Sequence, residues 1–200
     1  GGAVSADRTD PNATLGAPEG TYASGTFYSL GFAYDATTGA VYPGANDYAG
    51  GAAPPANGYL VVSFDHPVYN APGDEDIVVS EVTNGRDSYP DERADVYVLH
   101  DGQWVAAGFT VSNQDDVAGP GTGAVGIPDG IESVDTILLV DATDPAIHSG
   151  NADGYDIDGI GAAYLLLGDD PVREETAWAD GDRFVDRGSW ATYVEYTLDD

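Results

Sequence analysis

The sequence predicts an all-β fold, and three of its features support this. Short apolar runs recur about every 10–20 residues along the chain. Stretches rich in glycine and proline separate these runs, and the chain holds 27 glycines and 12 prolines. Nowhere does an apolar period of about 3.6 residues persist long enough to indicate an α-helix. These features are typical of an antiparallel β-sandwich or barrel.

Seven of the apolar runs match strands within the first 167 residues. The clearest local signal is a hairpin, because Ala94–Leu99 and Gln103–Phe109 flank the dipeptide Asp101-Gly102. An Asp-Gly pair between apolar runs favours a two-residue turn. The other five runs are Phe27–Tyr34, Tyr59–Phe64, Ile77–Thr83, Ile137–Val140 and Tyr155–Leu167.

The distribution of polar segments predicts the domain organisation. Residues 1–167 form the β-sandwich domain, and residues 35–58 are an inserted loop of Gly, Ala, Pro, Asn and Tyr without apolar periodicity. Structureless loops of this length are usually functional or mobile. Residues 168–200 lie beyond the domain as an acidic linker followed by a terminal strand.

The terminal strand alternates in character, so its larger side chains share one face. Because strand backbone groups need a sheet edge and an apolar face needs a core, this strand needs a binding surface. It either folds back onto its own sandwich or adds to the edge of a neighbouring copy, which would build filaments. The residues on the candidate assembly face are Trp190, Thr192, Val194, Tyr196 and Leu198.

The charge of the chain is extreme. It contains 35 acidic and 6 basic residues, for a net charge of −29, and all of the basic residues are arginine. Such a chain repels itself at low salt, whereas molar salt shortens the Debye length to about 3 Å. Acidic, lysine-free chains of this kind resemble the proteins of extreme halophiles. The charge also argues against a nucleic-acid partner, which requires a basic surface.

The residue types argue against most enzyme classes. The absence of cysteine excludes disulfides, thiolate catalysis and cysteine-ligated metal sites. The three histidines, His66, His100 and His148, lack the spacing of a zinc site. The sequence has no nucleophile-elbow motif and no phosphate-binding glycine loop. We therefore expect no enzyme, although a glycan-active hydrolase, which needs only two carboxylates, stays open as a third hypothesis.

A candidate metal site lies between Val134 and Ala163. Two predicted strands meet there at a loop rich in Gly, Asn and Asp, and Ca²⁺ takes six to eight oxygen ligands in loose geometry. Solvated surface aspartates are the competing interpretation, because acidic residues are abundant throughout the chain. The candidate ligands in this stretch are Asp141, Asp144, Asp153, Asp156 and Asp158.

The order of the motifs resembles a secreted β-sandwich family of the galactose-binding-like, discoidin-type jelly-roll kind. The resemblance covers about residues 12–167 and rests on the order of the motifs along the chain. It rests on Leu15–Gly20, Phe27–Gly31, Tyr59–Phe64, Ile77–Thr83, Ala94–Val98, Gln103–Val105, Leu139–Asp144 and Asp153–Gly159.

The resemblance implies a jelly-roll-like sandwich, non-catalytic binding or adhesion, and a structural calcium ion. It also adds Glu81 to the candidate ligands, since that residue matches an acidic position of the family pattern. The insertion at 35–58 and the extension after residue 167 depart from the family, whose glycan pocket lies in variable loops. The family's glycan-binding role therefore carries over poorly to this chain.

Export is expected from two features of the N-terminal region. The triplet Asn12-Ala13-Thr14 is an acceptor site for glycosylation, and the chain starts with Gly1-Gly2, after a trimmed Met or a cleaved leader. No apolar run approaches the ~20 residues of a membrane span. The predicted function is an exported, non-enzymatic extracellular or cell-surface subunit, structural or adhesive, which associates with itself or with other surface proteins. The alternative is a carbohydrate-binding module, in which exposed tyrosines stack on glycans.

Overall fold

The computed structural model describes residues 6–14, 18, 26–31, 58–73, 75–82, 89–117, 121–144, 154–167, 170–178, 184–186 and 192–194. Within these residues the secondary structure is β-strand, apart from two short 3-10 helices, η1 (Ala6–Arg8) and η2 (Pro11–Thr14). This confirms the prediction of an all-β fold. The strands are β1 (Tyr28–Ser29), β2 (Tyr59–Tyr69), β3 (Ile77–Glu81), β4 (Arg93–His100), β5 (Gln103–Ser112), β6 (Thr122–Val125), β7 (Ser133–Asp141), β8 (Asp156–Leu167), β9 (Asp170–Trp178), β10 (Phe184–Asp186) and β11 (Thr192–Val194).

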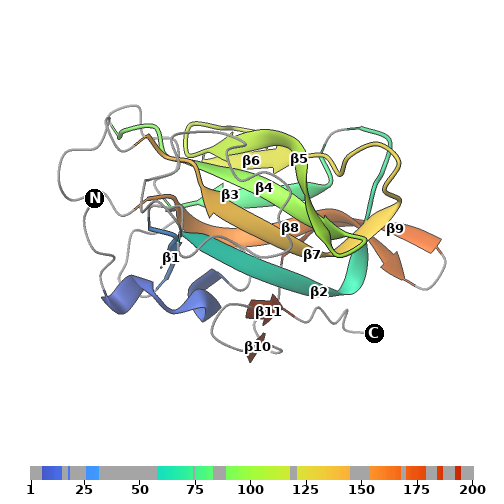
Figure 1. Ribbon diagram of the computed structural model, residues 1–200, viewed down its shortest axis with the longest axis horizontal. Coiled ribbons are helices and arrows are strands. Elements are labelled where there is room, and N and C mark those ends of the chain that lie inside the picture. Colours follow the sequence, from blue (N-terminus) through green and yellow to red (C-terminus); the bar gives the residue numbers. More distant parts are fainter. Residues whose placement is uncertain are drawn as a thin grey trace.

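The strands β1 to β9 form one antiparallel sheet with the order β5-β4-β7-β2-β8-β3-β6, and β1 and β9 both pair with β8. Strand β2 joins the two halves of the sheet: a register shift separates Ser63 from Val68, and Val68 then pairs with Leu165 of β8. The sheet curls so far that its two ends approach each other, and Gly108 N in β5 donates a hydrogen bond to Gly126 O at 3.3 Å (Figure 1). This curled sheet is compatible with a β-sandwich.

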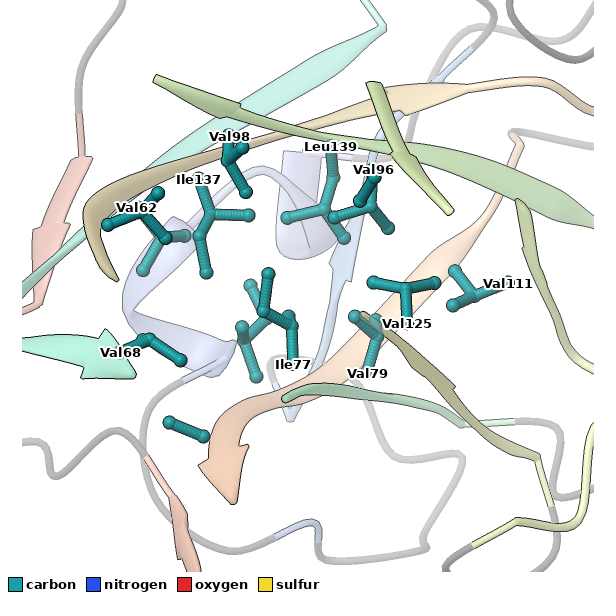
Figure 2. Packing of buried hydrophobic residues seen from close by; sticks show 14 of the residues in the cluster. Val62, Val68, Ile77, Val79, Val96, Val98, Val111, Val125, Ile137 and Leu139 are labelled. Atoms are coloured by element: carbon teal, nitrogen blue, oxygen red, sulfur yellow. The ribbon is translucent and has the colours of Figure 1, made fainter. Parts of the chain in front are cut away.

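The main core fills the space between the two halves of the sheet. Figure 2 shows Val62, Ile137 and Leu139 on one side facing Ile77 and Val79 on the other. All five side chains are almost completely buried. Because alternate residues of a strand point to the same face, each half contributes one row of aliphatic side chains to this core.

A second apolar cluster lies on the other face of the same strands. Leu138 and Val140 belong to it, whereas their neighbours Ile137 and Leu139 point into the main core. Strand β11 lies against β2, which carries Val61 of this cluster. The cluster comprises Val61, Tyr97, Trp104, Leu138 and Val140, with Tyr59 and Leu99 packed against it.

Several local predictions can be compared with the structure. The predicted hairpin is confirmed, because His100 pairs with Gln103 across a turn in which Asp101 has φ 50° and Gly102 has φ 74°. Strand β6 was not predicted, since its four residues are mostly small and carry little apolar signal. The segment interpreted as an acidic linker contains β9, which pairs with β8. The predicted insertion at 35–58 lies outside the described residues, except for Gly58.

Candidate metal centre

Three buried carboxyl groups from separate segments come together at one end of the core. Glu81 is the last residue of β3, Glu92 directly precedes β4, and Asp156 is the first residue of β8. All three residues are 0 % exposed. One oxygen from each lies within 4.8 Å of the other two, so the group could hold a metal ion.

The backbone brings Glu81 and Asp156 together through an irregularity in the sheet. The register between β3 and β8 shifts after Ser80, so Glu81 pairs with Ile157, and Val82 N donates a hydrogen bond to Asp156 O at 3.1 Å. Such bulges re-aim side chains and are common beside functional sites. On the other edge of β8, the Ser29 hydroxyl of β1 donates a hydrogen bond to Asp156 Oδ1.

Asn113 holds the segment that carries Glu92. Its side-chain Oδ1 accepts a hydrogen bond from Glu92 N at 3.2 Å, and its own N–H donates to Glu92 O at 3.1 Å. Its Nδ2 also donates to Pro90 O at 2.9 Å. Because Asn113 is completely buried, these three bonds fix the backbone at the start of β4, from which the Glu92 side chain extends.

Tyr155 lies beside this group of carboxyls. It is 0 % exposed, and no atom in the described part of the chain pairs with its hydroxyl. Burial, followed by the negative charges of Glu81, Asp115 and Glu92, raises the pKa of this hydroxyl well above its ordinary value of 10.0. Two of the three carboxyls, Glu81 and Glu92, are therefore among the negative groups that act on this hydroxyl.

Electrostatics explains why such a group favours a cation. At an effective dielectric constant near 20, two carboxylates 4.8 Å apart repel each other by about 3.5 kcal/mol. Three ionised groups contain three such pairs. A divalent ion among their oxygens would convert this repulsion into attraction.

The structure places the predicted ligands in different environments. Glu81 and Asp156 belong to the buried carboxyl group, and Asp158 is buried on β8 but is not part of it. Asp141 is also buried, and its Oδ1 accepts hydrogen bonds from Tyr155 N at 3.0 Å and from the Thr143 hydroxyl at 2.8 Å.

The remaining predicted site residues lie at or beyond the limits of the described part. Asp144 is exposed, and Asp153 lies outside the described residues. Asn12 falls within η2, although its side chain is not described. Thr192 and Val194 lie in β11, whereas Trp190, Tyr196 and Leu198 are outside the described residues.

Sequence reasoning missed Glu92. The charged residues beside it form a local ion pair, in which Arg93 Nε donates to Asp91 Oδ2 at 2.8 Å. A signal for Glu92 did exist, because it continues the alternate positions Ala94 and Val96, which point into the main core. An acidic residue at the end of an inward-facing row is expected to be buried there.

Comparison of the chain with protein-family models, with curated proteins and with solved structures gave no match. The described residues include no helix that is long and apolar enough to cross a membrane.

Proposed function

We propose that this chain is a non-enzymatic structural or adhesive module of an exported protein, and that calcium stabilises its fold. The observation that carries the proposal is the buried group formed by Glu81, Glu92 and Asp156. These residues come from three separate segments, and Asp156 lies 64 residues beyond Glu92 in the sequence. An ion bound among them would therefore cross-link β3, the start of β4 and β8.

Calcium is the ion that the ligand chemistry favours. The three side chains offer only carboxylate oxygens, which suit hard cations, and a set of carboxylates can bind in either monodentate or bidentate fashion. Calcium tolerates irregular geometry and six to eight oxygens. Magnesium is less suited, since it usually keeps several of its own waters and demands near-octahedral geometry.

Burial supports a structural role rather than a catalytic one. A carboxyl group must reach its substrate to act as an acid, base or nucleophile, whereas these three residues are 0 % exposed. The composition supports a role in an extracellular environment of high salt concentration, because a net charge of −29 needs screening. The galactose-binding-like resemblance, which a curled antiparallel sheet allows, adds adhesion and extracellular location to the proposal.

Calcium titration in molar salt tests the proposal. Native-state binding at about 100 times Kd stabilises by about 2.7 kcal/mol, which for a chain of this size raises Tm by roughly 5–10 °C. Glu92→Gln should abolish most of this increase. Asp95→Asn is the matched control, because Asp95 is also buried but accepts its hydrogen bond from the Thr110 hydroxyl, outside the site. An equal response of wild type and Glu92→Gln to calcium and to a chelator would refute the proposal.

Carbohydrate binding is a second candidate because of a separate groove. This groove has a volume of about 460 Å³ and is lined by Tyr69, Asp129 and Glu132 among others. Asn70 Nδ2 shapes its wall by donating to Ile127 O at 3.1 Å, as well as to Pro128 O and Ile131 O. An aromatic ring beside carboxylates is a suitable surface for sugar stacking and hydrogen bonding.

Glycan-array binding tests this second candidate. Wild type should bind a defined set of glycans, and Tyr69→Ala should lose that binding without a change in calcium-dependent Tm. Absence of binding by wild type, or full binding by Tyr69→Ala, would eliminate the groove as a glycan site.

Self-association through the C-terminal strand is part of the proposal. Within one chain β11 pairs with β10 and lies against β2, so the intramolecular arrangement is available without a second copy. Truncation after Trp178, which keeps the β9 strand paired with β8, separates the two hypotheses. Strand donation requires that assembly stops and that added peptide 188–200 binds the truncated chain, whereas an intramolecular strand requires an unstable product that aggregates.

A further inference from the structure

Tyr155 contributes an unusual polar atom to the candidate metal centre. The residue directly precedes Asp156 and is completely buried, yet no described atom pairs with its hydroxyl. Buried tyrosine hydroxyls normally find a hydrogen-bond acceptor. The acidic residues around it, Glu81, Asp115 and Glu92, all act on it electrostatically.

The backbone on both sides of this tyrosine is held firmly. Tyr155 N donates to Asp141 Oδ1 at 3.0 Å, and Tyr155 O accepts from Leu30 N at 3.0 Å. The strand then continues into the pairing of Asp156 with Ser29. The backbone that carries the buried ring is therefore fixed by the fold, which is the property expected of a residue that supports a binding site.

We propose that the Tyr155 hydroxyl belongs to the metal centre and donates a hydrogen bond to a water molecule bound to the ion. This inference rests on the proposed calcium site. A metal ion cannot accept a hydrogen bond, so direct coordination by the neutral phenol would require a carboxylate oxygen to accept its proton, and that oxygen would then be a poorer ligand for the ion. A coordinated water uses one lone pair for the ion and can accept the phenol proton with the other.

The proposal assigns two residues different tasks. Glu92 binds the ion itself, and Tyr155 positions one of its water ligands. Groups that orient metal ligands typically change metal affinity by about 10–100-fold when they are removed. Tyr155→Phe should therefore weaken calcium binding by about this factor, whereas Glu92→Gln should weaken it further.

A paired measurement distinguishes this role from simple packing. Without calcium, Tyr155→Phe should be at least as stable as wild type, because it removes a buried hydroxyl that has no described partner. With saturating calcium it should be the less stable protein. The matched control is Tyr97→Phe, because Tyr97 is equally buried but its hydroxyl faces Asp95, away from the site. Tyr97→Phe should change the free energy of unfolding by the same amount with and without calcium.

The experiment is calorimetric titration of calcium into wild type, Tyr155→Phe, Glu92→Gln and Tyr97→Phe at fixed molar salt. Bound water is counted independently from europium luminescence lifetimes in H₂O and D₂O, with wild-type protein, and at least one ion-bound water is expected. The inference is overturned if Tyr155→Phe binds calcium as tightly as wild type, or if the bound europium carries no water. If wild type itself binds neither ion, the proposed calcium site fails as well.

Discussion

Replacement of Gly154 by alanine tests how tightly the start of β8 is packed. Gly154 has φ 86°, a left-handed conformation that side chains disfavour. A Cβ atom at this position would lie 2.8 Å from Asp141 Oδ1 and 2.9 Å from the carbonyl carbon of Gly31. One of these atoms accepts the hydrogen bonds that hold Tyr155 and Thr143, and the other is backbone.

Gly130 supplies a matched control for this substitution. Its φ is 88°, but a Cβ there would meet nothing within 4 Å. A left-handed non-glycine residue costs roughly 1–2 kcal/mol, and the reduced freedom of the unfolded chain returns about 0.4–1 kcal/mol. Both variants share these two terms. Overpacking adds roughly 1–3 kcal/mol at Gly154 alone.

We therefore expect Gly154→Ala to be less stable than Gly130→Ala by roughly 1–3 kcal/mol. Chemical denaturation in molar salt measures both free energies of unfolding, and the slope of each transition shows whether the unfolded states are comparable. Calcium affinity provides a second readout, because displacement of Asp141 would also move the backbone N–H of Tyr155. Equal destabilisation of the two variants would show that Gly154 is not crowded and would refute the packing argument.

Three further outcomes are expected. Dilution of salt to tens of millimolar should unfold the chain, because screening then fails for a net charge of −29; unchanged circular dichroism after dialysis would contradict this. Burial raises the pKa of Tyr28 above 10.0, so its contribution to stability is complete below pH ~10 and is lost as pH rises through the folded-state pKa. Tyr28→Phe should reduce this loss of stability at alkaline pH, and a pH profile identical to that of wild type would contradict the contribution of Tyr28. Asp76→Ala should lower the free energy of unfolding by roughly 3–6 kcal/mol, since buried Asp76 accepts hydrogen bonds from Ala71 N at 2.9 Å and Ile127 N at 2.8 Å. The control is Asp65→Ala at an exposed position, and similar denaturation midpoints for the two variants would refute the stabilising role of Asp76.

The fold class was predictable because it depends on local patterns. Alternating apolar residues and an Asp-Gly turn are visible in the sequence, and they correspond to β4, β5 and the hairpin between them. The closure of the sheet was not predictable. It depends on the bend in β2 between Ser63 and Val68 and on the short strand β6, which is held by backbone pairing with β3 rather than by large apolar side chains.

The candidate site was predictable only in part. Asp156 stands out because it opens a strand beside a glycine-rich loop, whereas Glu92 is hidden within an acidic run that includes Asp91. Strand alternation separates these two neighbours: Asp91 accepts a bond from Arg93 at the surface, and Glu92 points inward. The meeting of Glu92 with Glu81 depends on which strands are neighbours, and composition and spacing do not reveal that.

The buried carboxyls show that the acidity of this chain has more than one cause. Screening by salt can offset the repulsion between surface charges, but it cannot stabilise groups that water does not reach. The buried carboxyls of Asp76 and Asp141 are stabilised by the hydrogen bonds that they accept from backbone N–H groups. The carboxyls of Glu81 and Glu92 instead converge with a third on one point. The two classes should therefore respond to different treatments: dilution of salt acts on the surface, and chelation of calcium acts on the interior. A chain saturated with calcium should still unfold on dilution, and a chain in molar salt should still lose stability when calcium is removed. If saturating calcium prevented unfolding on dilution, or if molar salt prevented the loss of stability on chelation, a single effect would account for both sets of carboxylates. A separate metal centre would then be unnecessary.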